Sequence, residues 1–284
     1  AGRFPKRNNW DGLLPVPGDG RYEWDGYFDM DTLPVEYNPK RGYSATANSM
    51  NLPSGYPIND FKIGFEWSAP WRYLRIMEAL EGNANHSLED SAKLQRDYKS
   101  VLAREVISKL PRLSEYDQNL LRDWNFNLAP DSSSAALWAV WYYKHFIPNI
   151  KVLIDPYLQR PEGSSEIDSL TVLDLLDTQR GKTIAYETLS PAISELKKLL
   201  GENPATWNWG DLHQIKFSHP LYRMADHSTK QNLAIKPYPR GGSANTANNT
   251  GFSALDFNVR SGASFRMVID VGSWDNSTMT NAPG

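Results

Sequence analysis

Asn48 stands where a short alternating stretch of the sequence ends. Tyr43, Ala45 and Ala47 alternate with small polar residues, which is typical of a β-strand, and the pattern stops at Asn48. Asparagine is unfavourable inside a strand but suits its end, where the side-chain amide can turn toward another group. Two uses of this amide stay open: a neutral hydrogen-bond donor at a reaction site, or a bond to its own main chain in a local turn.

Two histidines and a glycine-rich loop are further candidates for chemistry. His213 and His219 are six residues apart, so on a strand both would face the same side, as in a metal site. No third ligand cluster accompanies them, and we interpret both as structural residues. The loop 240–249, RGGSANTANN, resembles a phosphate-binding loop in composition. It has neither the G-x-G-x-x-G spacing nor a following Lys-Ser or Lys-Thr, so phosphate binding is not predicted.

The composition excludes several classes of function. The chain has 284 residues and a net charge of −3, so no basic surface for nucleic acid is predicted. It contains no cysteine, which excludes disulfides, thiolate catalysis and cysteine-based zinc sites. It has no apolar run of about eighteen residues, so no membrane-spanning helix is predicted. Its ten tryptophans favour an aromatic interior, and we interpret Trp207 and Trp209 as core residues.

The elements that must position the candidate residues fall into three zones. Residues 1–70 are rich in glycine, proline and aromatics, which predicts loops around short strands. Residues 71–201 show helical periodicity, and residues 202–284 return to strand patterns. Strands at both ends with helices between them predict an α+β domain whose sheet carries a large helical insertion.

Individual elements follow from caps and periodicity. Four helices are expected, and the third is apolar on every side and therefore buried. Ser87 with Asp90, and Ser190 with Pro191, are typical helix starts, while glycines mark two helix ends. The expected helices cover 71–82, 86–110, 133–146 and 190–201, and the expected strands cover 254–260 and, as a more buried strand, 264–271.

Six blocks of the sequence, in order, resemble the penicillin amidase (penicillin acylase) family of N-terminal-nucleophile hydrolases. The similarity covers nearly the whole chain, and a chance match of six ordered blocks is improbable. The blocks are LLPVPGDGRYEWDGY (13–27), NPKRGYSATAN (38–48), WRYLRI (71–76), WNWGDLHQIKFSHPL (207–221), GGSANTANN (241–249) and GASFRMVIDVGSWDNSTMTNAPG (262–284).

The resemblance implies a fold and a reaction. Family members have an α/β/β/α sandwich and cut themselves into two chains, and the new N-terminal Ser of the second chain hydrolyses an acyl-amide bond. The match begins well inside that second chain, and nothing near Ala1 resembles the nucleophile segment. We therefore expect a C-terminal part of the catalytic (beta) chain that lacks its nucleophile and is inactive alone.

The resemblance also implies roles for three residues. Asn48 matches the family asparagine that donates its amide to the tetrahedral oxyanion. Arg72 matches a family arginine near the active site, although Arg75 competes for the alignment, and a helix-start ion pair is the structural alternative. Asp60 falls where penicillin acylases supply a carboxylate to a structural calcium ion, with an exposed loop residue as the alternative. Asn245 and Asn248 would shape the pocket.

The expected partners follow from the same resemblance. They are the remainder of the precursor (the alpha chain and the N-terminal part of the beta chain) and a small acyl-amide substrate, with no organic cofactor, nucleic acid or membrane. The location would be periplasmic or secreted. Strands without their neighbours expose edges, so we expect the isolated chain to self-associate.

Two other functions compete with an acylase. One is a catalytically incompetent binding or scaffold module derived from the same fold. The other is an ordinary serine or metal hydrolase, which the absence of G-x-S-x-G and H-E-x-x-H motifs disfavours. Penicillins, cephalosporin side chains, lactone signals and lipopeptides all stay open as substrates.

Overall fold

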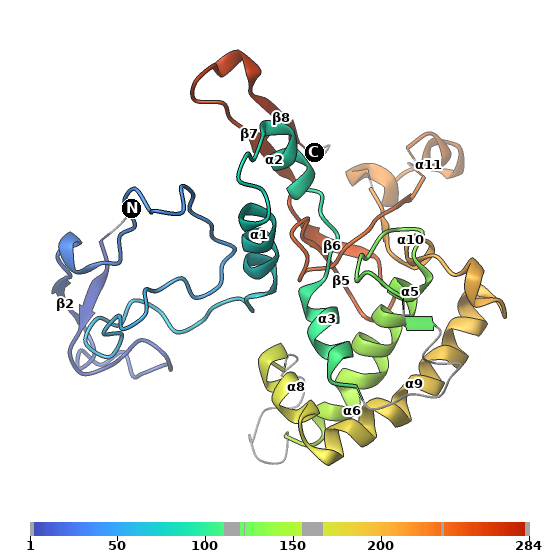
Figure 1. Ribbon diagram of the computed structural model, residues 1–284, viewed down its shortest axis with the longest axis horizontal. Coiled ribbons are helices and arrows are strands. Elements are labelled where there is room, and N and C mark those ends of the chain that lie inside the picture. The colour runs from blue at the N-terminus through green and yellow to red at the C-terminus, as the bar shows by residue number, and fades with distance from the viewer. Residues whose placement is uncertain are drawn as a thin grey trace. The chain divides into compact units, whose positions relative to one another are not determined.

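The computed structural model describes residues 3–110, 120, 121, 123–154, 167–217, 219–233 and 236–281. The chain divides into two compact units, Ala1–Tyr73 and Leu74–Gly284. Figure 1 draws the first unit in blue tones, and the colours of the second end in red. The three zones expected from the sequence stay a prediction. The division into compact units does not test whether the two end zones belong to one sandwich and the middle zone is an insertion.

The first unit consists mainly of loops. Its strands β1 (Pro5–Arg7) and β2 (Trp24–Tyr27) pair antiparallel, and a short 3-10 turn, η1, covers Met30–Thr32 (Figure 1). Among the described residues of this unit, the buried hydrophobic side chains are Ala47 and Trp71. Because burial of apolar surface is the main driving force of folding, so small a core stabilises this unit little.

Helix α1 (Trp71–Glu81) runs continuously across the boundary between the two units. Its predicted end is confirmed, because Gly82 follows directly and donates its N–H to the Glu78 carbonyl oxygen at 3.0 Å. The first turn of α1, which carries Arg72, belongs to the first unit. The remaining turns belong to the second unit.

The single helix expected over 86–110 is wrong, because the structure has two helices there. They are α2 (Leu88–Leu94) and α3 (Val101–Ser108). The predicted start of the first is confirmed: Ser87 Oγ accepts from the Asp90 N–H at 3.1 Å, and the Asp90 carboxylate accepts from the Ser87 N–H at 3.0 Å. These two bonds form a capping box.

The segment between α2 and α3 has a partner that is distant in the sequence. Its Asp97 carboxylate bonds to the Arg75 guanidinium in α1. Ser100 then begins a new helix, because its Oγ accepts a main-chain N–H at 3.0 Å. The apolar periodicity continues through the break, so periodicity alone does not reveal it.

The core of the second unit is built around one long buried stretch. It comprises α5 (Ser133–Ala139), a π-helix η2 (Val140–Phe146) and α6 (Ile147–Lys151). Helix α9 (Gln179–Leu200) packs against η2 (Figure 1), and Trp141 Nε1 donates to Thr188 Oγ1 of α9 at 3.0 Å. The predicted burial is confirmed for the hydrophobic side chains Ala135, Ala136, Leu137, Trp138, Ala139, Val140, Trp141, Tyr142 and Phe146.

Helix α9 (Gln179–Leu200) begins well before Ser190, the predicted cap, so that start is wrong. Thr178 is the actual cap, because its hydroxyl accepts a main-chain N–H at 3.1 Å. Pro191 lies inside the helix, although proline usually marks a first turn. The predicted stop at Gly201 is confirmed, since its φ of 96° suits glycine.

Every sheet among the described residues is an antiparallel pair of strands. The pairs in the second unit are β3 with β4, β5 with β6 and β7 with β8. Their bounds are β3 Gln214–Ile215, β4 Tyr238–Pro239, β5 Thr250–Phe252, β6 Val259–Gly262, β7 Phe265–Val268 and β8 Thr278–Asn281. The other helical elements are α8 Ser169–Leu176, η3 Pro204–Thr206, α10 Trp209–Leu212, η4 Pro220–Arg223, α11 His227–Leu233 and η5 Trp274–Asn276.

The strand expected over 254–260 is wrong for most of its length. The segment before Val259 is a turn, in which Phe257 takes a left-handed φ of 56°. Phe257 is 2% exposed and packs on Trp209, whereas Leu255 is 88% exposed. Alternate residues therefore do not share a face here, although their spacing is that of a strand.

The strand expected over 264–271 is present as β7, but its predicted burial is wrong. Phe265 and Met267 are each 50% exposed. The chain combines helices, most of which lie between Trp71 and Leu200, with antiparallel strand pairs that lie outside this range, so the predicted α+β class is confirmed. Among the described residues, no helix combines the length and apolar character needed to cross a membrane.

Candidate active site

The main chain at Asn48 forms a fixed bend rather than a strand end. Exposure alternates before it, but the segment from Tyr43 has no partner strand among the described residues, so the predicted strand is wrong. Asn48 takes a left-handed φ of 63°, which asparagine tolerates better than most residues. Its carbonyl oxygen accepts from the Ser68 N–H at 2.8 Å, and its neighbours Ala47 and Ser49 are buried. The exposed Asn48 side chain thus projects from an anchored backbone.

The side chain of Asn48 is oriented by Arg72. Arg72 Nη2 donates to Asn48 Oδ1 at 3.0 Å, and both residues belong to the first unit. A guanidinium has donors only, so the amide oxygen must face Arg72 and the amide nitrogen must point away. Within the described part of the chain, no residue accepts a hydrogen bond from Asn48 Nδ2. The amide therefore presents a free donor, and it does not bond to its own main chain.

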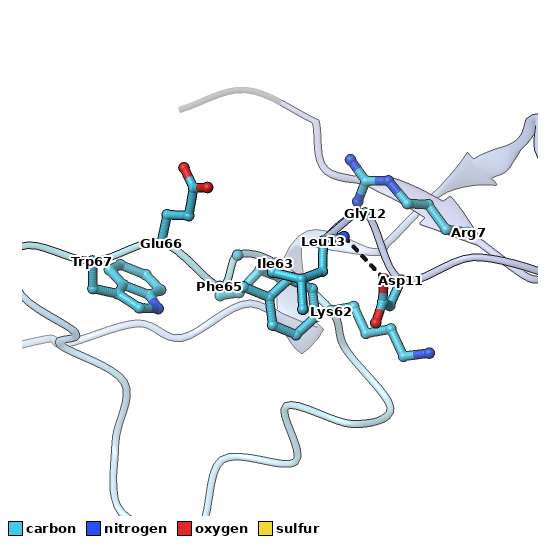
Figure 2. Close-up of a pocket in the computed structure, with 10 residues that line it drawn as sticks. Arg7, Asp11, Gly12, Leu13, Lys62, Ile63, Phe65, Glu66 and Trp67 are labelled. Carbon is cyan, nitrogen blue, oxygen red and sulfur yellow. Dashed lines mark hydrogen bonds between the residues drawn. The ribbon is translucent and has the colours of Figure 1, made fainter. Parts of the chain in front are cut away.

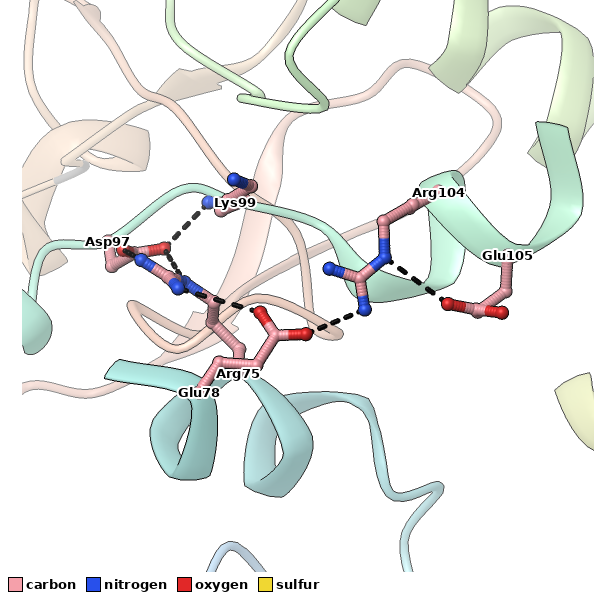
Figure 3. Close-up of polar contacts among 6 residues, drawn as sticks. All are labelled: Arg75, Glu78, Asp97, Lys99, Arg104 and Glu105. Carbon is pink, nitrogen blue, oxygen red and sulfur yellow. Dashed lines mark hydrogen bonds and ion pairs between the residues drawn. The ribbon is translucent and has the colours of Figure 1, made fainter. Parts of the chain in front are cut away.

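Arg72 and Arg75 have different surroundings, which separates the two candidates for the family arginine. Arg75 bonds to the Asp97 carboxylate through Nε and Nη2, at 3.1 and 2.6 Å, and this raises the pKa of Arg75 (Figure 3). Arg72 is half-buried, and burial lowers its pKa. Among the described residues it forms no ion pair with a carboxylate. Arg72 is thus the arginine placed at Asn48.

The described residues do not make up a calcium site. The Asp60 side chain is exposed, and its N–H donates to the Pro57 carbonyl oxygen at 3.0 Å within a turn. No group of three or more metal-ligating side chains occurs among the described residues. Calcium takes six to eight oxygen ligands, so Asp60 would be one ligand of several.

A pocket of about 430 Å³ in the first unit contains none of the predicted site residues. Arg7 and Lys62 line it together with Asp11 and Glu66, and Trp67 stands at one side (Figure 2). Asp11 Oδ1 accepts from the Leu13 N–H at 2.9 Å, which fixes one wall. Asn48 therefore does not line this pocket.

The two histidines lie in different surroundings. His213 is fully buried and stacks on Trp209, with ring centroids 4.7 Å apart, while His219 is exposed and its Nδ1 accepts from the Leu221 N–H at 3.2 Å. His213 Nδ1 donates to the Phe257 carbonyl oxygen at 2.9 Å. The two rings lie in different surroundings, and the interpretation of both as structural residues stays a prediction.

Lowering the pH should destabilise the protein through His213. Burial, with a smaller effect of Arg240, lowers the pKa of His213 from 6.5 to about 4, against the raising effect of its bond to Phe257. The unfolded chain therefore binds a proton before the folded chain does. Stability is complete above pH 6.5 and falls as the pH drops toward 4, by about 3 kcal/mol in total.

Urea unfolding at pH 7.5 and 4.5 measures this loss. His213→Asn keeps an N–H near the position of Nδ1 but does not titrate in this range, so it should reduce the difference between the two pH values. An equal pH dependence in both proteins would show that His213 is not the cause.

The loop 240–249 is held by buried polar bonds. Asn248 Nδ2 donates to the Gly241 carbonyl oxygen at 3.0 Å, and Asn248 Oδ1 accepts from Thr246 Oγ1 at 2.6 Å. Asn245 Nδ2 donates to Tyr143 Oη at 3.3 Å. Both side chains are engaged in internal bonds, so their pocket-shaping role stays a prediction.

The family model for penicillin amidase matches residues 1–284, the whole chain. The chain belongs to the penicillin amidase family. The predicted membership of the penicillin amidase family is thereby confirmed.

Two named relatives and one solved structure are similar to this chain. The chain is 28% identical over 313 residues to an acyl-homoserine lactone acylase, QuiP, of Pseudomonas putida, covering 96% of this chain and 38% of that protein. It is 26% identical over 295 residues to the penicillin acylase 2 proenzyme of Pseudomonas sp. strain SE83, covering 97% of this chain and 37% of that protein. A penicillin G acylase structure from Alcaligenes faecalis matches with a TM-score of 0.49 and 18% identity, covering 72% of this chain and 45% of that one.

One residue important for the arrangement is not evident from the sequence. Asp97 bonds to Arg75, its Oδ1 accepts from the Lys99 N–H at 2.8 Å, and its carbonyl oxygen accepts from the Asn248 N–H at 3.1 Å. It joins α1, the break before α3 and the loop 240–249. Its sequence neighbours give no signal of this, because its main partner lies 22 residues away.

Proposed function

We propose that this chain is part of the catalytic chain of a longer amidohydrolase that cleaves the bond between an acyl group and an amine. Membership of the penicillin amidase family supports this, as do relatives named acylases. The chain spans 38% and 37% of the length of two such relatives. The small core of the first unit also fits a segment that packs against further polypeptide.

Asn48 is the proposed oxyanion donor. Attack on an amide carbonyl places negative charge on its oxygen, and a neutral donor held at that oxygen lowers the barrier. The observation that carries the proposal is the orientation of the amide: Arg72 bonds to Oδ1, and Nδ2 faces away without an acceptor in the described residues. A donor fixed before the reaction needs no reorganisation when the charge forms.

Arg72 is the proposed positioning residue for this amide. Its planar guanidinium holds Asn48 Oδ1 with one nitrogen and keeps further N–H groups for other acceptors. A half-buried cation without a carboxylate partner in the described residues would also attract a substrate carboxylate. Both roles rely on a guanidinium rather than an ammonium group.

The proposed nucleophile is an N-terminal serine outside these 284 residues. Its hydroxyl oxygen bonds to the acyl carbon while its own α-amine takes the hydroxyl proton. The tetrahedral intermediate then expels the amine, which takes that proton, and leaves an acyl-serine ester. Water hydrolyses the ester to the free acid and regenerates the serine. Asn48 Nδ2 would donate to the same oxygen in both tetrahedral intermediates.

The other expectations belong to this longer protein. It would be a precursor processed into two chains, exported to the periplasm or secreted, and active without an organic cofactor. Asp60 would supply one carboxylate to a structural calcium ion whose remaining ligands lie elsewhere in the precursor. The present chain alone would be inactive and prone to self-association through its uncovered apolar residues.

The mass of the natural gene product and a panel of acyl amides test the proposal. A product more than about twice as long as this chain, in keeping with the 38% share of one relative, that matures into two chains and hydrolyses such amides is the expected result. A product no longer than this chain that binds acyl amides without turnover would instead indicate the binding module.

A further inference from the structure

The hairpin of β7 and β8 has one uncovered apolar face. Residues directly opposite each other in an antiparallel pair share a face, and Met267 is opposite Met279 while Phe265 is opposite Asn281. Phe265 and Met267 are 50% exposed and Met279 is 72% exposed. Ile269, two residues beyond Met267, is 44% exposed on the same side.

The opposite face of the hairpin is attached to the second unit. Arg266, between two outward residues of β7, donates through Nη2 to the Asn248 carbonyl oxygen at 2.7 Å. Its Nη1 donates to the Gln95 carbonyl oxygen. The hairpin is therefore held from one side, and its apolar side chains point the other way. The uncovered face is not the result of a detached hairpin.

The two edges of the hairpin also differ. One main-chain acceptor at the edge of β7 is satisfied, because Gln95 Nε2 donates to the Met267 carbonyl oxygen at 2.8 Å. The outer edge of β8 (Thr278–Asn281) has no main-chain partner among the described residues. Its sequence, TMTN, has no charge or proline, the features that usually prevent pairing at an edge. An open edge next to an apolar face is suited to an added strand.

We propose that this edge and face of the hairpin receive a β-strand from the remainder of the same longer polypeptide. This inference rests on the proposed function, which requires such a remainder. The matched relatives contain such a remainder, since 62% of the length of one lies outside the matched region. A strand of alternating uncharged residues would extend the sheet beyond β8 and lie beside Phe265, Met267 and Met279. The hairpin thus serves as the attachment surface for the missing polypeptide.

Cysteine labelling tests the proposal, because the chain contains no cysteine of its own. Met279→Cys is made in the 284-residue chain and in the longer protein, and its maleimide reaction rate is measured by peptide mass in dilute native solution. We expect rapid labelling in the 284-residue chain and labelling slower by about tenfold or more in the longer protein. Protection in the longer protein should not change on further dilution.

Two variants serve as controls. Met267→Cys, on the facing strand, should repeat the result if Met279→Cys prevents folding. Glu202→Cys lies in the loop after α9, where the side chain is 84% exposed, and should react equally fast in both proteins. Its rate corrects for differences in reagent access and protein handling.

Three results would overturn the proposal. Equal rates at Met279→Cys in both proteins would show that the face stays open. Protection that disappears on dilution of the longer protein would assign the face to a second copy. Protection already present in the dilute 284-residue chain would assign it to residues of this chain. A gene product of only 284 residues would instead contradict the proposed function, and its mass reveals that before any labelling.

Discussion

Asn48→Gly in the longer enzyme should lower kcat by about a hundredfold or more, with little change in stability. The substitution removes the amide that would bond to the oxyanion, and one such donor contributes about 3–4 kcal/mol to lowering the barrier. Glycine is chosen because the backbone at this position has a φ of 63°, which glycine adopts without strain. Steady-state kinetics on a cleaved acyl amide measure the effect, and thermal unfolding shows that the fold is kept.

Other substitutions at position 48 separate the effect of the amide N–H donor from the effects of the amide oxygen and of the backbone conformation. Asn48→Asp keeps an acceptor for Arg72 but loses the N–H donor, so it should be as inactive as the glycine variant. Asn48→Ala should lose activity and also about 1 kcal/mol of stability, because alanine is strained at this φ. Asn51→Gly, an exposed neighbour, is the matched control and should leave kcat unchanged. An Asn48→Gly enzyme as active as the parent would exclude Asn48 from the oxyanion site.

Arg72 shows which part of the site can be predicted from sequence and which cannot. The family motif identifies Asn48 and gives two arginines as candidates, because Arg72 and Arg75 are three residues apart on one helix. The choice depends on Asp97, whose carboxylate engages Arg75 and leaves Arg72 to Asn48. That carboxylate comes from a distant segment of the chain, so local sequence does not make the choice.

The helix ends show the same limit of local sequence as a predictor of the fold. Gly82 and Gly201 stop their helices by a local conformational preference, and both ends were predictable. The start of α9 was not, because Ser190 and Pro191 have the pattern of a cap while the burial of Ile184 and Leu189 extends the helix before them. Tertiary packing outweighed a local signal.

The burial predicted for strand β7 is wrong for a different reason. Its apolar residues predict burial, and they are exposed in this chain. The sequence encodes an apolar face, and the described part of the chain leaves it uncovered. On the proposal above, the prediction of burial holds in the longer protein, where the added strand would lie beside Met279.

Asp97→Ala should destabilise the second unit by about 3 kcal/mol. The Arg75 and Asp97 side chains are 20% and 18% exposed, and they are joined by bonds of 3.1 and 2.6 Å. Removing one partner of a largely buried ion pair leaves an unpaired charge, which costs about 3–5 kcal/mol, and partial access of water places this pair at the lower end. Denaturant unfolding of the 284-residue chain measures the loss.

A double-mutant cycle isolates the pair from the rest of its network. Glu78 Oε1 forms an ion pair with Arg104 Nη2 at 2.6 Å, and Glu78 Oε2 lies 3.6 Å from Arg75 Nη1 (Figure 3). Asp97 is therefore not the only carboxylate near the Arg75 guanidinium. If Arg75 and Asp97 act mainly on each other, Arg75→Met in the Asp97→Ala background should cost much less than it costs alone. Additive losses would show that Glu78 and the Asp97 bond to Lys99 carry the effect instead.

The size of this effect depends on burial rather than on the presence of opposite charges. Lys93 and Glu89 form an ion pair of 2.8 Å on the surface of α2, with side chains 60% and 76% exposed. Water screens such a pair, so Glu89→Gln should leave the denaturation midpoint unchanged within error. A loss equal to that of Asp97→Ala would mean that charge alone, and not the enclosed geometry around Arg75, determines the contribution of an ion pair to stability.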